Sequence, residues 1–215
     1  MYKEIPINVI VYTRECSVAR FYLHYLKESG YKVENIIILL NGELPKRGKT
    51  FWNFVPKKII AHIREFINLR KRSSGEMRSF IEEISQFFET KVNLMSKFNF
   101  HDYSRNVQVK VISGFYDKKL KNILSEQKNK TFLYTCGGIV KKDLLEIKNA
   151  KFVHIHPGIV PEVKGSDGFW WSLLTRGVTG ASCFFMNSGI DTGDVILKKN
   201  YKLPKMHLSQ IYSEK

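Results

Sequence analysis

Short apolar runs separated by one amphipathic stretch dominate the first forty residues. Residues 7–12 (INVIVY) and 33–40 (VENIIILL) are rich in β-branched side chains, which is typical of strands that are covered on both faces. Residues 17–30 between them have helical spacing, and Gly30 suits the end of a helix. The order strand, helix, strand predicts a βαβ unit and therefore parallel strands. The helix face expected to pack inward comprises Val18, Phe21, Tyr22, Tyr25 and Leu26.

The second half of the chain continues this alternation of strands and helices. The expected strands are residues 131–135, 151–156, 181–186 and 194–199. The expected helices are residues 117–127, 141–149 and 166–177, the last packing through Trp170, Trp171, Leu173 and Leu174. Together these elements predict an α/β fold class, a Rossmann-like, mostly parallel sheet flanked by helices.

A basic helical insertion interrupts the alternation at about residues 41–90. Within it, residues 46–72 contain many Lys and Arg side chains and a single acid, Glu65. The side chains expected to point inward from its first helix are Ile59, Ile60, Ile63, Phe66 and Ile67. The elements expected after it are a helix at 77–89 and a strand at 91–96. We therefore expect a single domain over residues 1–200 that carries this insertion, and a C-terminal extension, 201–215, that looks incomplete.

Charge and composition mainly indicate which partners the chain can have. The chain has 215 residues, of which 43% are hydrophobic, and a net charge of +15. This charge predicts an anionic partner such as a nucleotide-linked substrate, RNA or a membrane surface, although lysines that only keep the surface solvated give the same excess. The longest apolar runs are too short to span a bilayer, and neither a signal peptide nor a transmembrane segment is expected. The widely spaced Cys16, Cys136 and Cys183 fit a reducing cytoplasm.

The first strand-to-helix turn argues against one class of enzyme. Its sequence, TRECSVA, has no glycine. The G-x-G-x-x-G turn of dinucleotide-binding enzymes needs glycine where the backbone approaches the pyrophosphate. A dinucleotide-dependent oxidoreductase is therefore not expected.

The residues that suggest chemistry gather in two stretches, FVHIHPGIVPEVKG and GIDTGDVI. Residues two apart on a strand point to the same side, so His154 and His156 project together near the end of their strand. Open α/β sheets bind ligands at that edge. Asp191 lies in a glycine-flanked turn, and it reaches the histidines if its loop folds back over the same edge.

Three interpretations of these residues remain open. In the first they are structural: one histidine hydrogen-bonds the backbone, the other faces solvent, and Asp191 caps a turn. In the second, His154, His156 and Asp191 bind zinc, which needs a further ligand or an open position. In the third, a histidine polarises or protonates a carbonyl oxygen while Asp191 handles protons.

Residues 135–196 resemble the catalytic core of the folate-dependent formyltransferases, which act on methionyl-tRNA, glycinamide ribonucleotide or amino sugars. The family pattern is Asn-x-His-Pro, Leu-Leu-Pro, a glycine, a helix often containing Trp, and Asp-x-Gly before a strand. The matching positions in this chain are His154-x-His156-Pro157, Val160-Pro161, Gly165, Trp170/Trp171 and Asp191-x-Gly193. The chain departs from the pattern at His154, where the family has asparagine.

The resemblance implies transfer of a formyl group from the co-substrate N10-formyltetrahydrofolate to a primary amine, without a metal. It makes His154, His156 and Asp191 the catalytic residues, with His154 taking over the oxyanion contact of the family's asparagine. The residues implied to contact the donor are Cys136, Gly137, Gly138, Ile139, Val140, Asn187 and Gly189.

The expected acceptor is a nucleotide-linked amino sugar. Members of the family that act on tRNA usually carry a further C-terminal domain, for which we expect this chain to have no room. The glycine-rich phosphate turn expected for glycinamide ribonucleotide is not evident near the N-terminus. Methionyl-tRNA and glycinamide ribonucleotide remain alternative acceptors, and nucleic acid is the less favoured partner. A metal-dependent hydrolase and a non-catalytic RNA-binding module remain alternative functions.

Overall fold

The chain forms two compact units, Met1–Ala150 and Lys151–Lys215. A computed structural model describes residues 2–14, 16–42, 55–72, 98–114, 116–136 and 139–201. The elements predicted at 77–89 and 91–96 and the extension 201–215, apart from Tyr201, lie outside the described residues. The expectation of a single domain over residues 1–200 stays a prediction.

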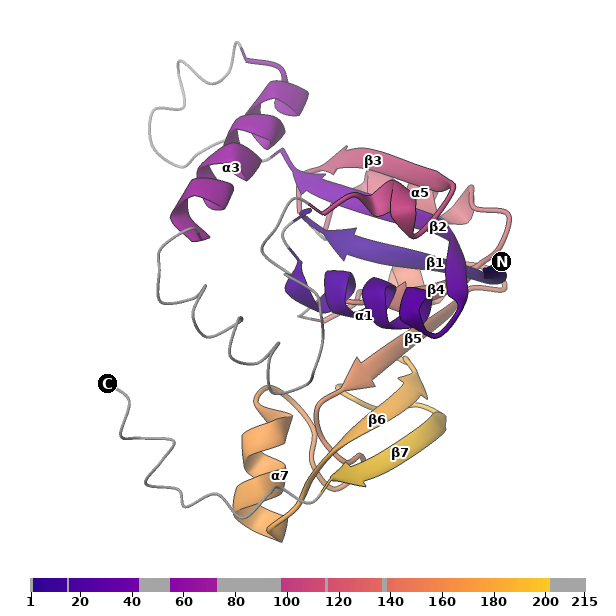
Figure 1. Ribbon diagram of the computed structural model, residues 1–215, viewed down its shortest axis with the longest axis vertical. Helices are drawn as coiled ribbons and strands as arrows, with labels where there is room; N and C mark the ends of the chain where they lie inside the picture. The colour runs from indigo at the N-terminus through magenta and orange to yellow at the C-terminus, as the bar shows by residue number, and fades with distance from the viewer. Residues whose placement is uncertain are drawn as a thin grey trace. The chain divides into compact units, whose positions relative to one another are not determined.

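Parallel strands form the centre of the first unit (Figure 1). These strands are β1 (Lys3–Tyr12), β2 (Tyr31–Asn41), β3 (Asn106–Ile112) and β4 (Thr131–Tyr134). They pair in the order β3-β2-β1-β4, and each strand runs parallel to its neighbours. The apolar runs of β1 and β2 lie at the centre of the core, because residues 9–11 and 36–40 are at most 2% exposed.

Helices cover these strands, as the βαβ pattern predicts. They are α1 (Ser17–Glu28), α3 (Lys57–Arg72), α5 (Lys118–Ser125), the short α6 (Lys142–Leu145) and a 3-10 turn, η1 (Phe100–Asp102). Helix α1 contacts β1 and β2, and α3 contacts β2 and β3. The predicted α/β fold class is confirmed. None of the helices in the described ranges combines the length and the apolar character needed to cross a lipid bilayer. The cytoplasmic location stays a prediction.

The predicted packing face of α1 is wrong in part, because Phe21, Tyr22 and Leu26 are only partly buried. Val18 and Tyr25 are 46% and 65% exposed, whereas Ala19, Arg20 and Leu23 are buried. Arg20 lies inside because its Nε donates a hydrogen bond to the Arg14 carbonyl at 2.8 Å, and its guanidinium lies 5.3 Å from the centre of the Phe98 ring. A charged side chain with fixed partners therefore replaces the apolar ones that the spacing favours.

The predicted face of α3 is also wrong in part, because a small residue takes the place of a large apolar one at the contact. Ile60 is buried as expected, but its buried neighbour is Ala61, and Ile59 and Ile63 are 49% and 38% exposed. The side chains of Phe66 and Ile67 lie outside the described part of the chain. A small residue at the contact allows the helix backbone to approach the strands.

Two further elements, β3 and α6, differ from the sequence prediction. Strand β3 is not among the predicted elements, although the alternation of its three valines with polar residues is the pattern of a half-buried strand. It lies at the outer end of the order β3-β2-β1-β4, and Val109 stays 41% exposed. Helix α6 ends four residues earlier than expected, and the chain leaves it through turns that include Asn149 at φ 64°.

The second unit contains antiparallel strands and one helix. The strands are β5 (Lys151–His156), β6 (Thr179–Phe185) and β7 (Val195–Tyr201), which pair in the order β5-β6-β7. The helix is α7 (Gly168–Arg176), which contacts β6.

The residues predicted to pack α7 are largely wrong. Trp170, Trp171 and Leu174 are 48%, 55% and 75% exposed, and the helix instead buries Gly168 and Ser172. Ser172 Oγ donates to the Gly168 carbonyl at 2.6 Å, so its polar group is satisfied within the helix. Small residues on this face bring the helix close to the end of β5, where the histidines lie.

Candidate functional site

Strand β5 carries both histidines of the predicted site. His154 and His156 are opposite Phe184 and Ser182 of β6 in the antiparallel register. His156 is 3% exposed. His154 is half-buried, and its ring meets the edge of the Phe184 ring at 5.9 Å between centres. The two imidazoles therefore differ in environment although they belong to the same side of one strand.

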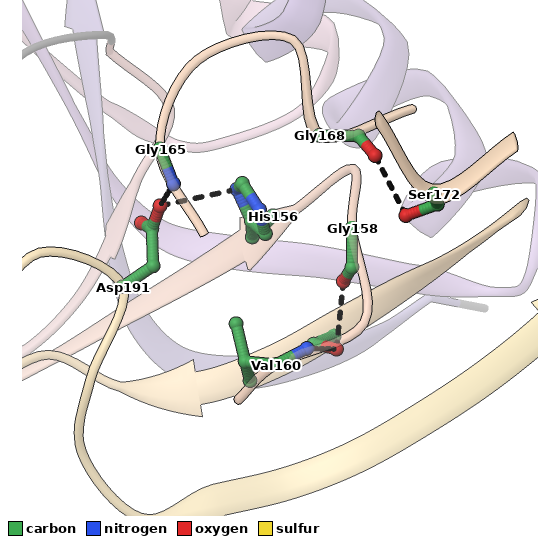
Figure 2. Close-up of polar contacts among 8 residues, drawn as sticks. His156, Gly158, Val160, Gly165, Gly168, Ser172 and Asp191 are labelled. Carbon is green, nitrogen blue, oxygen red and sulfur yellow. Dashed lines mark hydrogen bonds and ion pairs between the residues drawn. The ribbon is translucent and has the colours of Figure 1, made fainter. Parts of the chain in front are cut away.

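The loop between β6 and β7 brings Asp191 to His156. Asp191 has φ 46° and Gly193 has φ 120°, so the chain reverses sharply here. A Cβ at Gly193 would overlap the Phe185 carbonyl, which makes glycine necessary at this position. Asp191 Oδ2 accepts a hydrogen bond from the Gly165 N–H at 2.6 Å and lies 3.6 Å from His156 Nδ1, as Figure 2 shows.

Glycines also enclose the opposite edge of the His156 ring. A Cβ at Gly158 or at Gly168 would lie 2.6 Å or 2.7 Å from His156 Nε2. Both distances are well below van der Waals contact, so a side chain at either position would displace the ring. Nε2 is buried, and within the described ranges it has no hydrogen-bond partner of normal geometry. The ring therefore presents its Nδ1 edge to Asp191.

A buried serine fixes the turn that follows β5. Ser182 Oγ donates to the Gly158 carbonyl at 2.8 Å and accepts from the Val160 N–H at 3.1 Å. Sequence reasoning missed this residue. Its only signal is a small polar side chain in an otherwise apolar strand, and its position opposite His156 becomes clear only from the pairing of β5 with β6.

Opposing influences act on the protonation of His156. Burial is the largest and lowers the pKa of the imidazole, because a charged ring loses its hydration. The Asp191 carboxylate raises this pKa, a nearby His154 lowers it, and the Val163 carbonyl raises it. The net direction is downward, which favours the neutral imidazole, whereas Asp191 favours the protonated form.

The structure brings His154, His156 and Asp191 together: one donor atom from each lies within 4.8 Å of the others. This is the convergence that two of the three sequence interpretations require. The catalytic roles of these residues stay predictions.

The predicted donor contacts fall in two separate places. Asn187 and Gly189 precede Asp191 in its loop, where Asn187 Oδ1 accepts from the Gly189 N–H at 2.9 Å and also from Thr192 Oγ1. The other positions belong to the first unit: Cys136 and Val140 are buried, Ile139 is 64% exposed, and Gly137 and Gly138 lie outside the described residues. All of these contacts stay predictions.

Cys136 is poorly suited to act as a nucleophile. It is 6% exposed, and burial raises the pKa of its thiol to about 12. Because the thiolate is the reactive form, the side chain is inert near neutral pH.

Comparison with known proteins decides the family. A model of the formyl transferase family matches residues 9–213. The chain belongs to this family. The resemblance stated from the residues, and the prediction of a formyltransferase, are confirmed at that level. At position 154 this chain has histidine, where the family pattern given above has asparagine.

Individual relatives match over shorter stretches. The methionyl-tRNA formyltransferase of Ruminiclostridium cellulolyticum is 31% identical over 68 residues, which is 31% of this chain and 22% of that protein. The methionyl-tRNA formyltransferase of Thermodesulfovibrio yellowstonii is 27% identical over 99 residues, which is 46% of this chain and 31% of that protein. The alignments thus span less than a third of either relative.

Solved formyl transferases share the fold. The phosphoribosylglycinamide formyltransferase of Bacillus halodurans matches with a TM-score of 0.51 and 13% identity, over 99% of this chain and 87% of its own. The corresponding enzyme of Anaplasma phagocytophilum matches with a TM-score of 0.52 and 12% identity, over 97% of this chain and 77% of its own. The Rossmann-like fold predicted from the sequence is therefore confirmed.

The contact between Asp191 and His156 can be measured through the histidine pKa. We expect Asp191→Asn to lower the pKa of His156, because the substitution removes a negative charge that stabilises the imidazolium. An NMR titration of the imidazole ring protons measures this pKa. The control is Asp194→Asn in the same loop, which changes an exposed acid. An unchanged His156 pKa in Asp191→Asn would show that the carboxylate does not face the ring.

A double-mutant cycle of unfolding free energies tests whether Gly168 encloses the His156 ring. We expect Gly168→Ala to destabilise the fold by about 1–3 kcal/mol, since the added methyl overpacks a filled site. In a His156→Ala background the same change should cost about 1 kcal/mol less, because the main clashing atoms are gone. Urea unfolding of the four proteins measures both costs. Equal costs in the two backgrounds would mean that Gly168 does not enclose the ring.

Proposed function

We propose that this chain transfers a formyl group from N10-formyltetrahydrofolate to a primary amine. The observation that carries the proposal is the facing pair of His156 and Asp191, 3.6 Å apart, within the motif of the formyl transferase family. A buried imidazole beside a carboxylate provides one group that can stabilise developing negative charge and another that can accept a proton.

The proposed reaction begins when a neutral amine attacks the formyl carbon. The C–N bond to the acceptor forms, and the formyl oxygen becomes an oxyanion. His156 stabilises this oxyanion through a ring proton, and His154 supplies a second donor where the family has asparagine. Asp191, through a water, takes the proton lost by the amine and helps to deliver one to the folate nitrogen as its bond to the formyl carbon breaks.

The hydrogen bond that Asp191 accepts supports its assigned role. The Gly165 N–H donates to Oδ2, and the positive φ of Asp191 directs the carboxylate back towards β5. A carboxylate that is held in place needs no rearrangement when the proton arrives, and such preorganisation is a large part of enzymatic rate enhancement.

For the acceptor, we propose an amine on a nucleotide-linked sugar. The net charge of +15 supports an anionic acceptor. The connection between β1 and α1 has no glycine, and the residue before α1, Cys16, makes no side-chain capping hydrogen bond. This connection therefore lacks the glycine-rich turn through which a phosphate approaches the backbone. Its absence counts against glycinamide ribonucleotide as the acceptor.

Substitution of the paired residues tests the reaction itself. We expect His156→Ala and Asp191→Asn each to lower formyl transfer at least about a hundredfold, because each removes a group that acts on the transition state. Mass spectrometry of the formylated acceptor measures the rate, and circular dichroism checks that the variants fold. Asp194→Asn is the matched control and should stay within about twofold of wild type. Wild-type rates in either site variant would refute the assigned roles.

A panel of acceptors tests the choice of substrate. Incubation with the formyl donor and amino-sugar nucleotides, glycinamide ribonucleotide or methionyl-tRNA should give product chiefly with an amino-sugar nucleotide. Formylation of only one of the other two would keep the reaction and replace the acceptor. If no member of the panel is formylated and reduced folate does not raise the melting temperature, formyl transfer is refuted, because a ligand of the native state stabilises it.

A further inference from the structure

The cluster of His154, His156 and Asp191 has the composition of a metal site. It offers two imidazole nitrogens and one carboxylate oxygen, all within 4.8 Å of one another. Two nitrogens and one oxygen are a ligand set that suits zinc and similar divalent ions. The family's asparagine would contribute an amide to this position, so the third strong ligand arises from the histidine at 154.

The distances are close to those that a single ion requires. Ligands bound to zinc at about 2.0–2.2 Å in tetrahedral geometry lie about 3.3–3.6 Å from one another. His156 Nδ1 and Asp191 Oδ2 are 3.6 Å apart. Even a pair at the 4.8 Å limit needs to close by only about 1.2–1.5 Å. His154 is less buried than His156, and rotation of its side chain is the movement that would close this gap.

The surroundings hold two of the ligands in suitable orientations. Gly158 and Gly168 fill the space at Nε2 of His156, which leaves Nδ1 as the edge available to an ion. The Gly165 N–H already donates to Asp191 Oδ2. Hydrogen bonds of this kind to ligating carboxylates tune and orient metal sites.

We propose that His154, His156 and Asp191 bind one divalent ion of the zinc class, with the fourth position open to water. Bound in this way, Asp191 gives to the ion the lone pair with which it would accept the amine's proton, and the ligating imidazole nitrogens carry no proton to donate to the oxyanion. Metal binding and formyl transfer therefore exclude each other, and this second statement rests on the proposed function. The histidine at 154 makes the transferase site sensitive to zinc.

Direct binding of Zn²⁺ and Co²⁺ to the full chain tests the site without reference to activity. After removal of metals with a chelator, we expect wild type to bind one Co²⁺ with the visible absorption of a low-symmetry complex, and Zn²⁺ to displace it. His154→Asn, which restores the family pattern, should weaken the affinity at least about tenfold, since even loss of an outer-shell partner costs that much. His101→Asn removes an exposed histidine of η1 and is the matched control.

The outcomes separate the two proposals. Equal affinity in wild type and His154→Asn, or no binding of either ion by wild type, overturns the metal site whatever the activity. Zinc binding that leaves formyl transfer unchanged overturns the mutual exclusion. Zinc binding by a chain that shows no transfer to any acceptor in the absence of metal supports the site and counts against the proposed function instead.

Discussion

The contact between a buried imidazole and a carboxylate delivered by a distant loop is the interaction on which the account of this protein depends. His156 lies at the end of β5, and Asp191 arrives from the connection of β6 to β7. Their 3.6 Å separation requires a sharp reversal at Asp191 and a glycine at position 193, where a Cβ would overlap backbone. The packing around the ring is equally constrained, because Gly158 and Gly168 leave no room for another side chain at Nε2.

These constraints underlie both proposals made for the site, formyl transfer and the binding of a divalent ion. Burial lowers the pKa of His156 and so favours the neutral ring, while Asp191 opposes this effect. A neutral imidazole next to a carboxylate is suited to proton handling, and it is also the protonation state that a divalent ion requires. The family's asparagine would favour the first use. The imidazole of His154 adds the ligand that makes the second use available.

Sequence reasoning identified the features that depend on pattern and chemistry. The unbroken apolar runs of β1 and β2 indicated buried strands, and the spacing of His154 and His156 indicated that both belong to one side of β5. It identified the packing faces of the helices only in part. On α1, Arg20 lies inward because the Arg14 carbonyl and the Phe98 ring provide partners from other segments. Such tertiary partners leave no trace in helical spacing.

The same limit applies to the surroundings of the site. Trp170 and Trp171 look like packing residues, yet the contact of α7 is made by small residues, because the end of β5 lies close to the helix backbone. Ser182 orders the turn after β5, but its importance follows from the register of β5 with β6 and not from its own neighbours in the chain. The convergence of loop and strand could be anticipated, whereas the residues that enforce it could not.

The most direct test of the central claim is the coupling between His156 and Asp191 in catalysis. If the two side chains act as one unit, a chain lacking both should transfer formyl groups about as slowly as the worse of the two single variants, because removing either disables the pair. Single-turnover rates of wild type, both single variants and the double variant measure this coupling. Losses that simply multiply in the double variant would show that the two groups act independently and would contradict the account.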